Sequence, residues 1–383
     1  MTNPGFYEFF CGGGMARAGL GAGWTCLFAN DFDAKKGRAY AANWGAAALK
    51  VGDVAMLSTR DLPGIPQLVW ASFPCQDLSL AGAGAGLDGA RSGAFWPFWR
   101  LMRQLGEERR PPRAIVLENV CGALTSHGGC DFIAIANAIA AAGYRLGALV
   151  IDAAHFLPQS RPRLFIVAVA AEVAIPAACL AERPESIWTP PALKFAQARL
   201  AGEAAAHWLW WSLPAPLARN QSLADLLDEL PSRPEWHTTT QTERLISIMT
   251  PLHRAKLSAA KASGAFQVGA IFRRTRADAD GVRRQRAEVR FDNLAGCLRT
   301  PAGGSSRQII VVVRGDEVRT RLLSSCEAAR LMGLPDDYKL PERANDGLHL
   351  VGDGVAVPVV RHLADHLLAP LLRSAERGLQ AAE

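Results

Sequence analysis

Three features are missing from this 383-residue sequence, and each absence excludes a class of protein. No apolar run reaches the roughly 20 residues that a transmembrane helix needs, so no membrane-spanning segment is expected. The first ten residues lack a basic stretch followed by an apolar one, which argues against a secretion signal. The eight cysteines form no C-x-x-C pair and have no histidine at zinc spacing, so no metal is expected. We therefore expect a cytoplasmic protein with reduced thiols.

The composition is that of an ordinary globular protein, with 49% hydrophobic and 20% charged residues. This length suits one large and one smaller domain. The net charge of +6 is compatible with a polyanionic partner but does not by itself indicate one. The distribution of the charge along the chain is more informative. Between Arg273 and Arg290, seven arginines stand against three acidic residues, a local net charge of +4. Such a cluster suits phosphate contacts, although a solvated surface loop explains it equally well.

The first 170 residues alternate between short apolar runs and helical segments. Helices are expected at 15–22, 33–43, 92–107 and 131–142. The alternation predicts a doubly wound α/β sheet, in which ligands bind at the carboxyl ends of the strands. The expected strands are Gly5–Phe10, Thr25–Asn30, Leu49–Gly52, Leu68–Ser72, Ala114–Glu118, Ala148–Asp152 and Leu164–Val169.

The strand–helix pattern stops after Ala171, where prolines, tryptophans and the arginine cluster take over. Helical patterning returns at 324–332 and 357–372. We therefore expect one domain from residues 1–171 with 349–383. A second, irregular mixed α+β domain and the hinge to the first are expected over 172–348.

Polar residues follow the first three expected strands. The first strand runs into Phe10-Cys11-Gly12-Gly13-Gly14, where glycines allow a tight turn and close approach of a ligand. Asp31 ends the second strand, where a carboxylate can accept both ribose hydroxyls, and Asp53 follows the third. This series indicates a nucleoside cofactor, but it does not separate NAD from S-adenosylmethionine.

The next two strands end in residues suited to catalysis. Cys75, in Phe73-Pro74-Cys75-Gln76, lies where a nucleophile belongs, although a lone cysteine is more often a packing residue. Glu118 ends an apolar strand, where a carboxylate is costly without a partner or a role. Arg161 and Arg163 are expected to project to the same side, where they could bind a carbonyl oxygen, a phosphate or Glu118 itself. An ordinary surface ion pair would explain them equally well.

In this order, the motifs resemble those of the C5-cytosine-specific DNA methyltransferase family over nearly the whole chain. The resemblance implies a Rossmann-like, class I S-adenosylmethionine-dependent fold. The matching segments are Phe10-x-Gly12-x-Gly14, Asn30-Asp31-Phe32-Asp33, Gly52-Asp53, Pro74-Cys75-Gln76, Glu118-Asn119-Val120, Gln159-x-Arg161-x-Arg163, the stretch from Arg321 to Pro335, and Gly352-x-x-Val355.

The resemblance implies that Cys75 adds to C6 of cytosine, and that Glu118 binds N3 and the exocyclic amine. Arg163 would hold O2, Arg161 would support the loop and the phosphate, and Asn119 would brace the turn at Pro74. The cofactor would be S-adenosyl-L-methionine, leaving as S-adenosyl-L-homocysteine. The expected cofactor site comprises Phe10, Gly12, Gly14, Asp31, Phe32, Asp53, Val54, Pro74, Asp353 and Val355.

The implied substrate is double-stranded DNA, from which the target base must flip out. Residues 172–320 take the place of a target-recognition region. The chain is expected to act as a monomer, in a restriction-modification system beside a cognate endonuclease, or as a solitary or phage-borne enzyme. The expected DNA contacts are Gln76, Arg91, Ser92, Gln159, Arg273, Arg274, Arg299, Thr300, Gly303 and Gly304.

Three positions depart from the family pattern: Met15 replaces a glycine, Ala81 a polar residue, and Asp353 an asparagine. Three alternative functions explain the sequence less well. A tRNA cytosine methyltransferase would have a more compact recognition region. An inactive DNA-binding regulator would not need intact catalytic motifs. A nicotinamide oxidoreductase would leave Cys75, Glu118 and the paired arginines unexplained.

Overall fold

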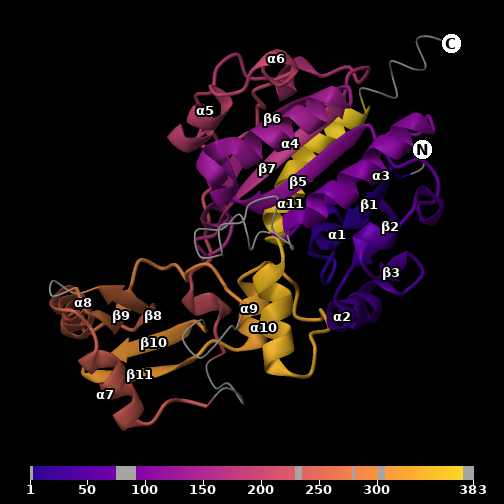
Figure 1. Ribbon diagram of the computed structural model, residues 1–383. Coiled ribbons are helices and arrows are strands. Elements are labelled where there is room, and N and C mark those ends of the chain that lie inside the picture. Colours follow the sequence, from indigo (N-terminus) through magenta and orange to yellow (C-terminus); the bar gives the residue numbers. More distant parts are fainter. Residues whose placement is uncertain (1–2, 75–91, 229–234, 278–280, 301–306, 374–383) are drawn as a thin grey trace. The chain divides into compact units, whose positions relative to one another are not determined.

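The computed structural model describes residues 3–74, 92–228, 235–277, 281–300 and 307–373. The chain divides into two compact units, each treated by itself below (Figure 1). The first unit comprises Met1–Asp152, Pro162–Leu217 and Val357–Glu383. The second comprises Ala153–Arg161 and Ala218–Ala356. These boundaries differ from the expected ones mainly because the segment after Ala171 stays with the first unit.

The first unit is built on a seven-stranded sheet with the order β3-β2-β1-β4-β5-β7-β6. Neighbouring strands from β3 to β5 run parallel, and β7 is antiparallel to both of its neighbours. The predicted α/β sheet is confirmed. Its strands are β1 Gly5–Phe9, β2 Thr25–Asp31, β3 Leu49–Val51, β4 Leu68–Ala71, β5 Ala114–Val120, β6 Tyr144–Asp152 and β7 Pro162–Ala170.

Helices cover this sheet because apolar side chains recur along one side of each. In α3, Phe95, Phe98 and Trp99 follow helical spacing and are buried. Helices α1 and α11 meet at Gly19, where an added Cβ would lie 2.3 Å from Cβ of Val360. The helices are α1 Met15–Leu20, α2 Ala34–Trp44, α3 Phe95–Glu107, α4 Cys130–Ala141, α5 Pro191–Gln197, α6 Gly202–Ala206 and α11 Val357–Leu363, which continues into a π-helix at Ala364–Leu368.

The tryptophan-rich segment extends the first unit because it bonds to β6 and β7. Val150 donates its backbone N–H to the carbonyl of Trp188 (2.8 Å), and the indole of Trp211 donates to the carbonyl of Val167 (3.2 Å). Gly147 makes the close approach possible, since a Cβ there would lie 2.2 Å from the carbonyl oxygen of Leu209. Residues 172–217 therefore pack on the sheet instead of joining the second unit.

Among the described residues, Ala344–Arg373 is the one helical stretch long and apolar enough to cross a membrane. Its most apolar window has a mean hydropathy of 1.3, and 61% of that window is buried inside the protein. Gly354 ends α10 (Ala344–Asp353) within this stretch. Such burial is typical of a core helix.

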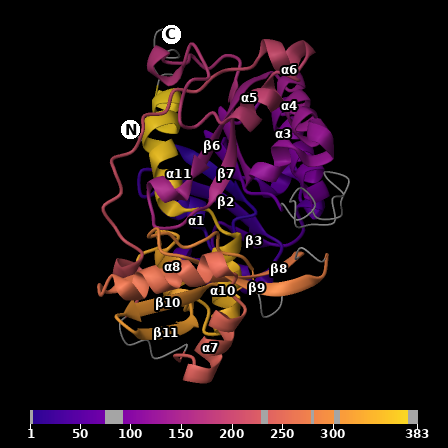
Figure 2. The same ribbon diagram turned by 90° about the vertical axis from the view of Figure 1, so that its left-hand side faces the viewer.

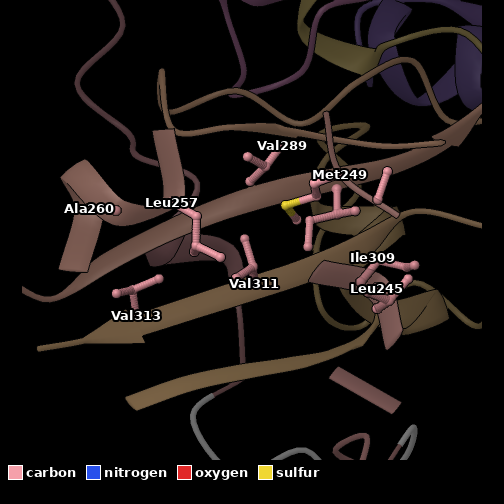
Figure 3. Close-up of a cluster of buried hydrophobic side chains, with 10 residues drawn as sticks. Leu245, Met249, Leu257, Ala260, Val289, Ile309, Val311 and Val313 are labelled. Atoms are coloured by element: carbon pink, nitrogen blue, oxygen red, sulfur yellow. The ribbon is translucent and has the colours of Figure 1, made fainter. Parts of the chain in front are cut away.

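The second unit contains a four-stranded antiparallel sheet with the order β11-β10-β8-β9. Figure 3 shows its core, formed by side chains of the sheet and of α7 and α8. Sequence patterning did not reveal this sheet, because arginines occupy the exposed parts of two strands. The elements are α7 Thr239–Ser247, α8 Pro251–Ala262, β8 Gln267–Ala277, β9 Arg283–Arg290, β10 Ile309–Arg314, β11 Glu317–Leu322 and α9 Ser325–Arg330.

The arginine cluster forms an arm of paired strands and not a loop. Strand β10 pairs with β8 only up to Ile271, whereas β9 pairs with β8 as far as Ala277. The outer parts of β8 and β9 therefore extend beyond β10 as a two-stranded ribbon, visible in Figure 2.

A buried ion pair holds the second unit together. Glu327 and Arg321 are almost wholly buried, with 2.5 Å between Oε1 and Nη2. The carboxylate also accepts the backbone N–H groups of Ser324 and Asp228, both at 2.9 Å. Burial alone would raise the pKa of Glu327, but these hydrogen bonds and the guanidinium charge bring it below its usual value.

Replacing Glu327 with alanine is therefore expected to destabilise the protein by about 3–5 kcal/mol, since Arg321 would stay buried without its partner. Urea unfolding measures this loss, with Glu243→Ala on the exposed side of α7 as the control. Because the folded pKa is lowered, the wild-type contribution is present above about pH 4.5 and disappears as the pH falls through the folded pKa. A loss below about 1 kcal/mol would contradict the argument.

Candidate active site and cofactor site

The predicted site residues of the first unit meet at the carboxyl edge of its sheet. Strands β1, β4 and β5 are neighbours, with Phe9 beside Ala71 and Ala71 beside Leu117. The residues that follow these three are the glycine turn, the segment leading to Pro74, and Glu118. Strand order reverses between β1 and β4, and ligands bind beside such a switch point.

Glu118 and Arg163 form a pair at this edge. Arg163 lies opposite Val120 in the β5–β7 register, so its side chain projects from the same face as Glu118. The distance from Nε of Arg163 to Oε1 of Glu118 is 3.3 Å, and both side chains are largely buried. Of the alternatives left open by the sequence, the structure thus shows Arg163 beside Glu118.

Asn119 braces the end of β4. Its Nδ2 donates to the carbonyl of Phe73 (3.2 Å), and its Oδ1 accepts the N–H of Val120 (2.9 Å). Nearby, the indole of Trp70 donates to Oγ of Ser72 (3.0 Å). These bonds fix the backbone up to Pro74, immediately before Cys75, which lies outside the described residues.

The glycine turn after β1 has the conformation that its residues allow. Gly12 and Gly14 have φ of 55° and 78°, and Phe10 also adopts a left-handed conformation with φ of 57°. The indole of Trp44 donates to the carbonyl of Gly13 (2.9 Å). A Cβ at Gly14 would lie 2.4 Å from that indole nitrogen, so only glycine fits there.

Asp31 links this turn to β2. Its Oδ2 accepts the N–H of Gly12 (2.7 Å), and its Oδ1 accepts the N–H of Asp33 (2.8 Å). Burial raises the pKa of Asp31 in spite of these bonds. Each carboxylate oxygen keeps a second acceptor position for a ligand hydroxyl. Beside it, Phe32 is 75% exposed, which leaves an aromatic ring available for stacking.

Replacing Asp31 with alanine is expected to weaken S-adenosylmethionine binding by about 10- to 100-fold, because two hydrogen bonds to a charged acceptor would be lost. Equilibrium binding by calorimetry measures the effect. Asp33→Asn is the matched control, since it removes a charge but keeps an acceptor oxygen for the N–H groups at the start of α2. An unchanged affinity in Asp31→Ala would remove this residue from the site.

Asp53 and Val54 follow β3 at the same edge. Oδ1 of Asp53 accepts the N–H of Ala55 (2.8 Å) and caps a short 3-10 helix, while Val54 is buried. Asn30 holds this strand end, because its Nδ2 donates to the carbonyls of Lys50 (2.9 Å) and Gly52 (3.0 Å). The role of Asp53 toward a cofactor stays a prediction.

Glu8 lies beneath the glycine turn and was not anticipated from the sequence. It is 1% exposed, and its Oε1 accepts the N–H of Arg17 (3.3 Å) near the start of α1. Burial raises the pKa of Glu8 to about 8. The signal that could have found it is a carboxylate in the middle of an otherwise apolar strand.

This shifted pKa predicts a pH dependence of stability. Between about pH 4.5 and pH 8 the folded state binds the proton of Glu8 more tightly than the unfolded state, so stability falls as the pH rises. Glu8→Gln is expected to reduce this slope. Urea unfolding at about pH 5 and about pH 8 compares the two proteins. Equal slopes would show that Glu8 is ionised in the folded protein throughout this range.

Two predicted ligand-contacting residues have internal roles in the second unit. Arg161 is 2% exposed, and its guanidinium donates to the carbonyls of Leu298 (3.1 Å), Gly352 (2.8 Å) and Gly354 (2.7 Å). It thus supports the carboxyl end of α10, and these donors are not directed at a phosphate. The prediction that Gln159 contacts DNA is corrected, because its side chain is fully buried and its Nε2 donates to the carbonyl of Leu331 (2.6 Å).

Other predicted contacts remain predictions. Arg274 is exposed on β8, and the Arg299–Thr300 backbone lies against Gly352. Asp353 and Val355 belong to the second unit. Among the described residues, no three His, Cys, Asp or Glu side chains are grouped as metal ligands would be. The predicted residues outside the described part are Cys75, Gln76, Arg91, the side chain of Ser92, Gly303 and Gly304.

The fold and this edge of the sheet define a Rossmann-like enzyme of the methyltransferase class. The C-5 cytosine-specific DNA methylase model matches residues 5–369, so the chain belongs to this family, whose members use S-adenosylmethionine. It is therefore a DNA cytosine-5 methyltransferase family enzyme.

Known relatives agree with this assignment. The chain is 32% identical to type II methyltransferase M.BsuFI of Bacillus subtilis over 164 residues, which cover 42% of this chain and 38% of that one. It is 23% identical to M.NlaX of Neisseria lactamica over 374 residues, covering 97% and 98% of the two chains. Its fold is similar to that of the S. pombe Dnmt2 methyltransferase, with a TM-score of 0.59, 17% identity, and coverage of 96% and 99%.

Proposed function

We propose that this protein transfers a methyl group from S-adenosylmethionine to C5 of cytosine in double-stranded DNA. The observation that carries the proposal is the Glu118–Arg163 pair, formed between β5 and β7. Strand β5 is the neighbour of β4, and Asn119 holds the segment that leads from β4 to Cys75. A carboxyl group and a guanidinium 3.3 Å apart match the adjacent N3 and O2 atoms of a cytosine ring.

In the proposed reaction, the thiolate of Cys75 forms a bond to C6 of the flipped base. Glu118 hydrogen-bonds N3 and the exocyclic amine, and Arg163 binds O2, so electron density moves to C5. S-adenosylmethionine would supply the methyl group for C5, and breakage of its S–CH3 bond would leave S-adenosylhomocysteine. Loss of the C5 proton to water and of the Cys75 sulfur from C6 would then restore the aromatic ring and the thiolate. Positioned acid–base groups of this kind typically contribute about 10²- to 10⁴-fold.

The residues present fit the cofactor. The glycines of the turn from Phe10 to Gly14 allow a ligand to approach the backbone closely, and Asp31 has remaining acceptor positions beside an exposed Phe32 ring. S-adenosylmethionine supplies an electrophilic methyl group on a sulfonium. Asp31 would hold the ribose hydroxyls, and Asp53 the adenine amine.

The β8–β9 arm is the proposed DNA contact. A two-stranded ribbon fits the major groove of B-DNA, and arginines can hydrogen-bond guanine edges or neutralise phosphates there. Arg274 and Arg276 both lie near Glu288, at 3.5 and 2.7 Å, so one carboxylate orients two guanidiniums on an exposed face. Arg273 projects from the opposite face of β8, toward the core side.

Base-resolution methylation mapping of a plasmid that expresses the chain tests the proposal. The expected result is 5-methylcytosine at every copy of one short sequence, and none in a plasmid with an inactivated gene. A methylated tRNA with unmodified plasmid DNA would refute the DNA assignment. The protein is proposed to act as a monomer, either in a restriction-modification system or as a solitary or phage-borne modifier. The same map would show whether the methylated sequence is symmetric.

A further inference from the structure

A cavity of about 660 Å³ lies in the second unit, away from the β10–β11 turn and at one end of the apolar core. Leu245 of α7 and Ile309 of β10 belong to both the core and the cavity wall. Figure 3 shows these two side chains together at one end of the cluster, with Leu257 and Ala260 at the other. The cavity therefore begins where core packing ends.

The secondary structure explains why polar groups gather there. Gln241 and Arg244 of α7, and Ile248 directly after it, follow helical spacing and line the cavity with Leu245. On β8, Arg273 comes two residues after the buried Ile271, so its side chain projects from the same face of the strand. The faces of α7 and of the sheet that form the apolar core thus extend beyond it, and there they carry the polar residues that line the cavity.

The charges around the cavity have one sign. Arg244, Arg273 and Arg307 line it, and no carboxylate is among its lining residues in the described part of the chain. Guanidiniums that share one concave site repel one another, and a bound anion relieves this repulsion. Because the wall also includes Leu245, Ile248 and Ile309, the ligand should carry both an anionic group and an apolar surface.

Neutral hydrogen-bonding groups complete the wall. Nδ1 of His237 is 2.9 Å from Oγ1 of Thr320, which fixes the ring. Burial and the charge of Arg273 lower the pKa of His237, so this ring adds a polar contact without a further positive charge near neutral pH. Gln285 of β9 adds an amide, a group that pairs with adenine edges as arginine pairs with guanine.

We propose that this cavity binds a nucleotide, with the base against the apolar wall and the phosphate held by the arginines. Its size is within the range of small-ligand sites. The nucleotide comes either from the substrate DNA or from a free nucleoside monophosphate. The DNA source rests on the proposed function, whereas the free nucleotide does not.

Binding measurements on the full chain test this proposal with two probes, deoxyguanosine monophosphate and a fluorescent duplex that contains the mapped methylation site. Arg244→Gln removes one positive charge from the cavity wall. Lys256→Gln is the matched control, because it removes one positive charge from the exposed side of α8 in the same unit. Ile248→Trp fills the cavity without changing the charge, and thermal unfolding verifies that each variant is folded.

If DNA supplies the nucleotide, Arg244→Gln and Ile248→Trp should each weaken duplex binding about tenfold, against about twofold for Lys256→Gln. If the nucleotide is free, deoxyguanosine monophosphate should bind saturably to the wild-type protein, and both variants should abolish this binding. The affinity of each variant for the duplex should then be similar to that of Lys256→Gln. Either result supports the proposal.

Two results would overturn it. In the first, neither variant differs from Lys256→Gln with either probe. In the second, Arg244→Gln weakens duplex binding but Ile248→Trp does not, which reduces the site to a surface phosphate contact. These are binding measurements, so an absence of methyl transfer would refute the proposed function without changing their outcome.

Discussion

Replacing Cys75 with serine is expected to abolish detectable methyl transfer and to leave duplex DNA and S-adenosylmethionine binding within about twofold of the wild type. A serine hydroxyl is close in shape to a thiol, but it does not ionise near neutral pH. Without a thiolate, no bond to C6 forms and C5 stays a poor nucleophile. Transfer of a labelled methyl group to the mapped DNA site measures the loss.

A duplex with 5-fluorocytosine at the target position separates a lost nucleophile from a misfolded site. Fluorine blocks removal of the C5 substituent, so the wild-type protein should stay covalently bound to this DNA. The matched control is Cys121→Ser, a half-buried thiol in the same unit that the proposed reaction does not use. Trapping of Cys75→Ser, or loss of trapping in Cys121→Ser, would contradict the assignment.

The sequence predicted the first sheet well because its strands are short, apolar and buried. Strand β4, for example, is fully buried along Leu68–Ala71, and such a run between helical segments has few other interpretations. The polar residues that follow these strands were placed at one edge by the rules of α/β topology. The pairing of Glu118 with Arg163 was one of several partners that the sequence allowed, and only the β5–β7 register selects it.

Contacts between distant parts of the chain could not be predicted. Arg161 and Arg163 share a spacing that suggests one role, yet Arg161 donates to the carbonyl of Leu298 and of two glycines near residue 353. These partners lie 137 or more residues away in the sequence. The β8–β9 arm escaped prediction for another reason. Its outer residues are exposed on both faces, so they lack the alternation of apolar and polar residues that identifies a strand.

Replacing Glu118 with glutamine should lower the rate of methyl transfer by about 10²- to 10⁴-fold, with little change in the affinity for DNA or cofactor. Glutamine keeps the length and an acceptor oxygen, so packing at the end of β5 is preserved. It lacks the negative charge that pairs with Arg163, and an amide cannot transfer a proton to N3 of the base as a carboxyl group can. Single-turnover kinetics at saturating DNA isolates the chemical step.

The comparison that decides the role of Glu118 is with Arg163→Gln and the double variant. If Glu118 only orients Arg163, the double variant should be no slower than Arg163→Gln alone, because the guanidinium would already be absent. If Glu118 acts on the base directly, the double variant should be slower than either single variant. Glu107→Gln on the exposed side of α3 is the matched control, and it should leave the rate unchanged. A rate for Glu118→Gln within about tenfold of the wild type would remove Glu118 from the chemistry, and the paired charges would then serve only to hold β5 and β7 together.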